Sequence, residues 1–117
     1  MPNVDCSFSI KVKDQYKVVV RISGNYGRDR WSLAHELGHI VLNHYELYNV
    51  DTIYIDNLNE YERYILDREA DIFAEELLMP SDWVSRNQEF CAEELKDVFE
   101  VSKEAMAVKL SKIRMVK

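Results

Sequence analysis

The segment Ala34-His35-Glu36-Leu37-Gly38-His39-Ile40 lies in the middle of a stretch, residues 28–44, whose residue pattern predicts a helix. On a helical wheel this stretch has a broad apolar side, formed by Leu33, Ala34, Leu37, Ile40 and Val41. The remaining sector is polar and holds His35, Glu36, His39 and Asn43. A helix with so wide an apolar side is expected in the core, so its polar sector is expected to line a cleft.

The spacing of the two histidines in this segment predicts a metal site. Positions four residues apart lie on one face of a helix, so His35 and His39 can point their imidazoles at a single ion. Glu36 lies at the edge of the same sector and can reach a water molecule without binding the metal, as in the His-Glu-x-x-His pattern of zinc peptidases. Two unrelated histidines four residues apart are the alternative. The chain has only three histidines and two complete the pattern, which favours zinc, with Glu36 as general base.

Catalytic zinc needs a third protein ligand, and the residues after the second histidine do not provide it. The extended form of the motif requires glycine and histidine where this chain has Leu42 and Tyr45. His44 falls one residue short and, on the same wheel, faces away from His35 and His39. It is therefore predicted to be a helix-end histidine near the negative end of the helix dipole, and only secondarily a substrate contact.

A second helix, predicted over residues 60–79 and ended by Pro80, offers carboxylates for the third position. Its apolar residues fall on one broad face: Tyr61, Ile65, Ile72, Phe73 and Leu77. Glu69 lies within that face, where a carboxylate is costly unless it is paired or bound to a metal. A buried ion pair with Arg63 or Arg68 explains Glu69 equally well, and periodicity alone leaves both readings open. Rivals seven residues away are Glu62 and Glu76, while the carboxylates expected to be solvated are Asp67, Asp71 and Glu75.

The remaining segments complete an α+β pattern. Alternating apolar residues predict strands over 7–13 and 16–23, joined by a turn at Asp14-Gln15. A short strand is expected over 52–55, and Pro80-Ser81-Asp82 suits the start of a new helix. Two more helices are expected within 92–116, separated near Val101-Ser102. The expected fold is a small N-terminal β-sheet packed on a helical core.

Composition limits the possible classes of protein. The 117 residues, 47% hydrophobic and 31% charged, suit one compact domain over 1–117. A net charge of -6 argues against nucleic acid as the direct partner, because phosphate binding requires basic residues. Apolar runs such as 18–20 are too short to span a membrane. Cys6 and Cys91 show no pairing pattern and no signal peptide is visible, so a cytoplasmic protein with free thiols is expected.

Two blocks of sequence resemble one known family. Residues 30–39, RWSLAHELGH, look like the metal helix of the ImmA/IrrE metallopeptidases, and residues 69–80, EADIFAEELLMP, look like that family's second signature. The blocks occur in the family's order and at a similar separation, and the resemblance extends from about Arg28 to the C-terminus. It implies a zincin-like metal helix with zinc held by His35, His39 and Glu69, and Glu36 as the catalytic base.

The resemblance also implies a partner. Members of this family include cytoplasmic proteases of mobile elements that cleave a helix-turn-helix repressor, and regulators of stress responses. The expectation is therefore a zinc-dependent endopeptidase whose substrate is a DNA-binding repressor, without direct binding to nucleic acid or membrane. A non-catalytic, zinc-containing protein that binds a repressor without cutting it is the alternative.

Two weaker signals accompany these blocks. Residues 94–105 have the spacing of a helix-turn-helix, but the turn lacks glycine and the chain is acidic. An amphipathic pair of helices packed on the core is the favoured interpretation. Several tyrosines follow the metal helix, and one of them could donate a hydrogen bond to an oxyanion: Tyr45, Tyr48, Tyr54, Tyr61 and Tyr64.

Overall fold

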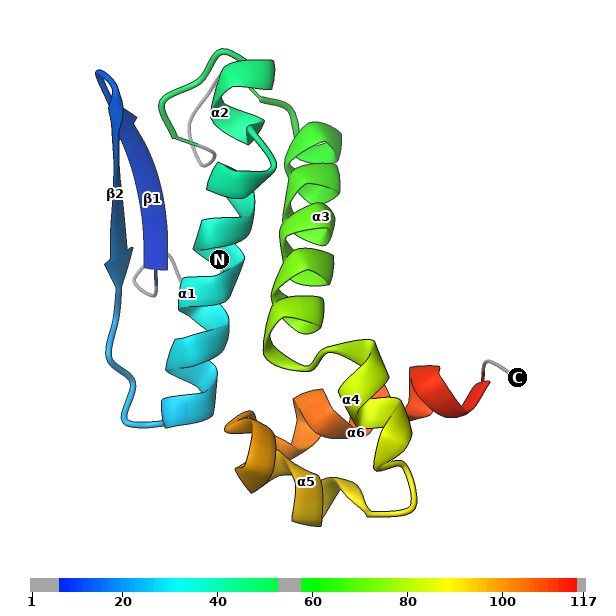
Figure 1. Cartoon of the computed structure of the whole chain (residues 1–117). Coiled ribbons are helices and arrows are strands. Elements are labelled where there is room, and N and C mark those ends of the chain that lie inside the picture. The colour runs from blue at the N-terminus through cyan, green and yellow to red at the C-terminus, as the bar shows by residue number, and fades with distance from the viewer. Residues whose placement is uncertain (1–6, 53–57, 116–117) are drawn as a thin grey trace.

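The computed structural model describes residues 7–52 and 58–115 and has the α+β architecture that the sequence predicts (Figure 1). Two antiparallel strands precede the helices. The elements in chain order are β1 (Ser7–Val12), β2 (Gln15–Val20), α1 (Tyr26–Val41), α2 (His44–Leu47), α3 (Glu60–Leu78), α4 (Ser81–Arg86), α5 (Ala92–Phe99) and α6 (Lys103–Met115). None of the described helices is long and apolar enough to cross a membrane.

Strands β1 and β2 form a hairpin that lies against α1. Ser7 pairs with Val20 at one end and Val12 with Gln15 at the other, so the turn is Lys13-Asp14, one residue earlier than predicted. Lys13 adopts a φ of 57°, which turns the chain within two residues. The backbone of the hairpin also contacts the segment after α2, through a bridge between Ile10 and Thr52. The strand expected over 52–55 lies largely outside the described residues.

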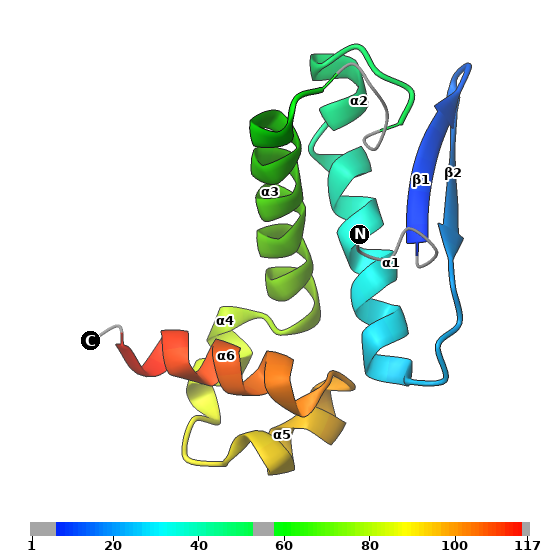
Figure 2. The ribbon, with the colours of Figure 1, turned by 180° about the vertical axis from the view of Figure 1, so that it is seen from behind.

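Helices α1 and α3 lie side by side in both views of the molecule (Figures 1 and 2). They approach closely because the residues between them are small. A Cβ atom added to Gly38 would lie 3.0 Å from the Cα atom of Ala70. The buried residues of α3 follow at four-residue intervals: Leu66, Ala70, Ala74 and Leu78. This close contact brings the polar residues next to it on both helices within reach of one another.

Helices α4, α5 and α6 form the base of the molecule beneath α1 and α3, whereas α2 lies at the opposite end (Figure 2). Their apolar side chains make one cluster with the lower part of the pair: Ala34, Ala74, Leu78, Met79, Val84, Leu95, Val101, Met106 and Leu110. Arg30 of α1 donates hydrogen bonds to the carbonyl groups of Phe99 and Glu100, which satisfies the end of α5. Helices α5 and α6 thus contribute buried residues to the core, as the packing interpretation predicts.

The predicted buried faces of the two long helices are only partly right, although Ala34 is buried as predicted. On α1, Leu33 and Val41 are exposed, whereas the polar residues Glu36 and His39 are buried. On α3, the residues of the predicted apolar face include three that are largely exposed: Tyr61, Ile72 and Leu77. Close contact between helices favours small residues, so the alanines of α3 face α1. Of the large apolar residues, Phe73 lies next to them, with its ring near Gly38.

Candidate metal centre

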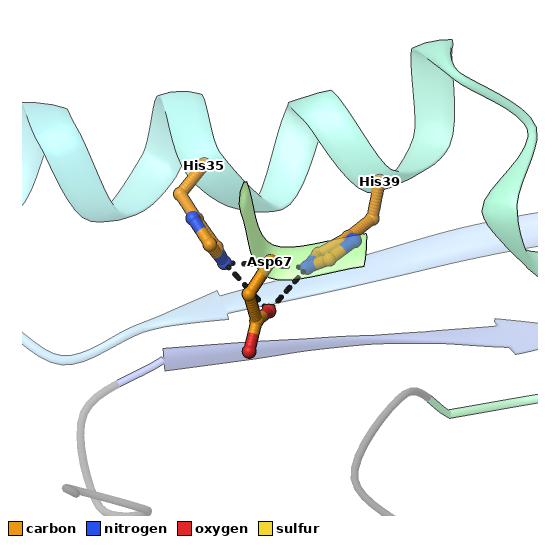
Figure 3. Close-up of side chains that lie close together, drawn as sticks. All are labelled: His35, His39 and Asp67. Carbon is orange, nitrogen blue, oxygen red and sulfur yellow. Dashed lines mark hydrogen bonds and ion pairs between the residues drawn. The ribbon is translucent and has the colours of Figure 1, made fainter. Parts of the chain in front are cut away.

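Three side chains from α1 and α3 converge on one point (Figure 3). The Nε2 atoms of His35 and His39 lie 3.2 Å apart. Asp67 Oδ1 lies 3.3 Å from His35 Nε2 and 3.2 Å from His39 Nε2. These donor atoms form a nearly equilateral triangle, and among the described residues they meet the geometric requirements of a metal-binding group.

The dimensions of this triangle fit a small tetrahedral cation. Zinc bonds to nitrogen and carboxylate oxygen measure about 2.0–2.2 Å, so atoms at tetrahedral corners lie roughly 3.3–3.6 Å apart. The observed separations of 3.2 to 3.3 Å need almost no adjustment. Two imidazoles and one carboxylate are also the donor set of many catalytic zinc sites, in which the fourth corner is left for water or substrate.

Each histidine is also held by a partner on its other ring nitrogen. His35 Nδ1 lies 2.8 Å from Asp71 Oδ1, one helical turn after Asp67 on α3. His39 Nδ1 lies 2.8 Å from His44 Nδ1. Contacts of this kind fix the ring orientation of metal-binding histidines and leave Nε2 free for the ion.

The carboxylates make the site favourable for positive charge. Burial alone would lower the pKa of His35, but hydrogen bonds with Asp67 and Asp71 outweigh it and raise that pKa to about 9. Burial opposes ionisation of Asp67, yet its hydrogen bonds with His35 and His39 hold its pKa well below the usual range. In the metal-free protein a proton on His35 supplies the positive charge, and a bound cation would displace that proton.

Glu36 is fixed by the hairpin. Its side chain is buried, and Oε1 accepts a hydrogen bond of 2.6 Å from the hydroxyl group of Ser9 in β1. The same hydroxyl group contacts that of Tyr45, whose pKa burial raises to about 12. Glu36 also contributes to the raised pKa of His35, so the two charges interact. Strand β1 therefore holds this carboxylate beside the metal-facing histidines.

Sequence reasoning did not identify Ser9. The alternation of Phe8, Ile10 and Val12 suggests that the apolar face of β1 is the buried one, but Phe8 and Val12 are exposed and Ser9 is buried. A serine flanked by apolar residues carries no signal of its own. Ser9 reaches Glu36 only because the hairpin packs against α1, and the sequence does not show that packing.

The third position is where the structure departs from the sequence prediction. His35 and His39 meet as predicted, but Glu69 does not join them. Its Oε1 lies 2.8 Å from His44 Nε2, and its side chain is 52% exposed. Asp67, which was expected to be solvated, lies beside the two histidines instead and forms with them a group that could hold a metal ion. The cause is the rotation of α3, whose alanine row faces α1 and places Asp67 and Asp71, not Glu69, beside the two histidines.

The two rival glutamates have other contacts. Glu62 belongs to a capping box with Asn59 at the start of α3. Glu76 accepts hydrogen bonds from the backbone and the hydroxyl group of Ser81, and it pairs with Lys109. Glu62 and Glu76 therefore have hydrogen-bond or ion-pair partners of their own, and neither needs a metal as a partner.

The prediction for His44 is also corrected. Its side chain is 1% exposed and lies against His39, whereas the wheel placed it away from the site. The wheel failed because α1 ends at Val41 and Asn43 adopts a φ of 61°, which turns the chain back. Asparagine is one of the few residues that tolerate this left-handed conformation, so Asn43 was the available signal for the break.

Comparisons with known proteins gave one match, to a family model. No curated protein and no solved structure matched the chain. A family model for peptidases, described as the IrrE N-terminal-like domain, matches residues 10–111. That range includes most of the hairpin, helices α1 and α3, and the base of the molecule. The chain therefore belongs to the IrrE N-terminal-like family of peptidases.

Proposed function

We propose that the protein is a zinc-dependent endopeptidase in which His35, His39 and Asp67 hold the metal. The observation that carries this proposal is the triangle of donor atoms with edges of 3.2 to 3.3 Å. Zinc prefers imidazole and carboxylate donors at this spacing, and three protein ligands leave a corner open. When bound, zinc lowers the pKa of a coordinated water molecule to about 7 and polarises a carbonyl group.

Glu36 would accept the proton of the attacking water and transfer it to the leaving amine. It lies next to His35 in the chain, and Ser9 restricts the orientation of its carboxylate. A structural metal site does not need a carboxylate fixed in this way. The position of Glu36 therefore favours catalysis over a structural role for the metal.

We propose a DNA-binding repressor of a mobile element or stress pathway, with a helix-turn-helix fold, as the substrate in the cytoplasm. Support comes from the resemblance of residues 30–39 and 69–80 to repressor-cleaving peptidases. The net charge of -6 argues against a direct role in binding DNA, so the effect on transcription would pass through the cleaved partner. Cleavage is expected at one or a few sites.

The test compares wild-type protein with Glu36→Gln, using the helix-turn-helix repressor encoded nearest to the protein's gene. Loss of the proton acceptor should lower the cleavage rate by about 10²- to 10⁴-fold, with the zinc content unchanged. Mass spectrometry of the repressor fragments and release of operator DNA are the readouts. Glu60→Gln, which removes an exposed carboxylate of α3, is the control and should cleave like wild type.

Two results would contradict parts of the proposal. If no fragments form and wild type and Glu36→Gln relieve repression equally, the protein acts by binding its partner and not by cutting it. If Glu36→Gln cleaves as fast as wild type, another group accepts the proton and the role assigned to Glu36 is wrong.

A further inference from the structure

A cavity opens between α1, α3 and α6, where the two long helices meet the base of the molecule. Its volume is about 540 Å³, within the range of roughly 300–1,000 Å³ that is typical of ligand sites. Its lining comes from the first half of α1, the middle and end of α3, and α6 with the loop before it. The roles proposed for zinc and Glu36 make no use of this space.

The cavity borders the candidate metal centre. Asp71 lines the cavity, and its Oδ1 atom lies 2.8 Å from His35 Nδ1. On α1, the lining residues Trp31 and Gly27 lie four and eight positions before His35. Such positions share one face of a helix at intervals of about 6 Å. An extended peptide advances about 3.3 Å per residue, so a peptide bound along α1 would place a side chain at the cavity roughly two to four residues from the bond at the metal.

The interior of the cavity is largely apolar. Trp31 packs against the apolar cluster of the base, and the buried residue Met79 belongs to that cluster. Ile72 on α3 and Val108 on α6 also line the cavity, although 56% and 51% of their surfaces are exposed. Ligand sites are typically concave and apolar, with a few polar groups that fix the ligand. The lining therefore suits an apolar side chain better than a polar one.

Charged side chains also line the cavity, and some of them already have partners. Glu75 Oε1 lies 2.7 Å from Lys112 Nζ, so these two charges offset each other. Arg28 and Arg68 are exposed, and within the described residues their side chains have no hydrogen-bond or ion-pair partner. Glu104 is likewise exposed and unpaired within this part of the chain. The unpaired charges at the cavity are thus two guanidinium groups and one carboxylate, an excess of positive charge.

We propose that this cavity is a specificity subsite for an apolar side chain of the substrate that stands next to an acidic residue. This inference rests on the proposed peptidase function. The apolar lining holds the side chain, and Arg28 and Arg68 pair with the neighbouring carboxylate, for which guanidinium groups are well suited. The subsite restricts cleavage to segments that carry this pair of residues about two to four positions from the bond.

Two short probes test the chemistry of the cavity without any cleavage. They are capped tetrapeptides with leucine followed by glutamate or by lysine, added to the ¹⁵N-labelled protein. The chain has two tryptophans, so a Trp83→Phe background assigns the indole signal of Trp31. The glutamate peptide should shift this signal and bind roughly two- to tenfold more tightly than the lysine peptide, the range expected for exposed ion pairs. An unmoved Trp31 signal at millimolar peptide, or equal affinity for both peptides, would overturn the proposal.

Charge reversal tests the two arginines. The double variant Arg28→Glu, Arg68→Glu should prefer the lysine peptide, and because both residues are exposed the fold should be retained, as circular dichroism would check. Arg86→Glu, an exposed change on α4 outside the cavity, should keep the preference of wild type. If the double variant still prefers the glutamate peptide, these arginines do not recognise the acidic residue and the proposal is wrong.

The repressor itself separates failure of the subsite from failure of the peptidase. Once the cleaved bond is mapped, an apolar residue next to an acidic one should lie two to four positions from it, as the advance of an extended chain requires. Replacing that acidic residue by lysine should slow cleavage by wild type and restore it in the double variant. If the repressor is cut at a bond without such a pair, the peptidase stands and the subsite is wrong. If it is not cut but the glutamate peptide binds at Trp31, the proposed peptidase function is wrong and the cavity binds a partner instead.

Discussion

The two ends of the α1–α3 pair are built from different kinds of side chain. At the end near α2, the buried polar residues Glu36, His39 and His44 lie beside a small apolar cluster. That cluster contains Tyr45, Val50, Leu58 and Leu66. At the other end, the helices join an apolar cluster that contains Val84 and Met106. Burying polar groups is costly even when they are paired, whereas burying apolar surface stabilises the fold. The comparison indicates that the larger apolar cluster lies at the base, whereas the other end combines a smaller apolar cluster with the buried polar groups of the candidate metal site.

Each end also has one helical glycine at a close contact. A Cβ atom on Gly38 would lie 3.0 Å from Ala70 Cα, between the two long helices. A Cβ atom on Gly27 would lie 2.8 Å from the carbonyl carbon of Val101, at the base. Both neighbours are backbone atoms, so neither can move without shifting a chain segment. The two glycines therefore allow the same change to be made at either end.

The largest expected difference in stability and metal binding comes from these two positions. Gly27→Ala should lower the free energy of unfolding by about 1–3 kcal/mol, as overpacked contacts do, and leave zinc affinity unchanged. Gly38→Ala should have a smaller effect on stability, because Gly38 lies inside α1, where alanine is favoured over glycine by up to ~1 kcal/mol, whereas Gly27 is only the second residue of the helix. It should nevertheless weaken zinc binding, because it moves α3 and Asp67 away from the histidines.

Urea denaturation and chelator competition on both variants measure the two quantities. Equal loss of zinc affinity in Gly27→Ala and Gly38→Ala would contradict the division of the molecule into two ends. Unchanged zinc affinity in Gly38→Ala would show that the spacing of α1 and α3 does not set the position of Asp67.

A smaller effect is expected for Glu76, a carboxylate at the base. Hydrogen bonds from the backbone and hydroxyl group of Ser81, together with Lys109, lower the pKa of Glu76 from 4.5 to about 2. Because its pKa is lower in the folded protein, Glu76 stabilises the fold above pH 4.5, and this contribution disappears as the pH falls toward 2. Its side chain is 56% exposed, so the contribution should stay below about 1 kcal/mol.

Glu76→Gln tests this small contribution. At pH 7 the variant should unfold slightly more easily than wild type, and the difference should vanish as the pH approaches 2. Zinc affinity should stay unchanged, because Glu76 lies away from the donor triangle. Loss of zinc in this variant would instead identify Glu76 as a ligand. The sequence left that possibility open, because Glu76 lies seven residues from Glu69 on the same side of the helix.

The sequence was sufficient for the two long helices and for the meeting of His35 and His39, but not for the short helix α2. His35 and His39 are fixed by local geometry, because four residues make about one turn whatever surrounds the helix. Pro80 ends α3 for an equally local reason. Local rules of this kind need no knowledge of the partner helix.

Which carboxylate of α3 lies beside the two histidines depends on how α1 and α3 pack against each other. A helical wheel describes one helix and carries no information on this packing. The prediction took the face of α3 with large apolar residues, such as Ile72 and Leu77, as the buried one. In the structure, α1 packs on the face with Ala70 and Ala74. Gly38 opposite this alanine row is the signal that could have corrected the choice, since small residues mark close helix contacts. Its meaning requires both helices to be considered together.

Zinc content of Asp67→Asn and Glu69→Gln, measured side by side with wild type, tests the central claim most directly. Asparagine keeps the size of Asp67 but removes its charge, so Asp67→Asn should lower zinc affinity by more than ~100-fold, beyond the range for supporting residues. Glu69→Gln should stay within about tenfold of wild type. If Glu69→Gln loses the metal while Asp67→Asn retains it, Glu69 is the third ligand and the donor set proposed here is wrong.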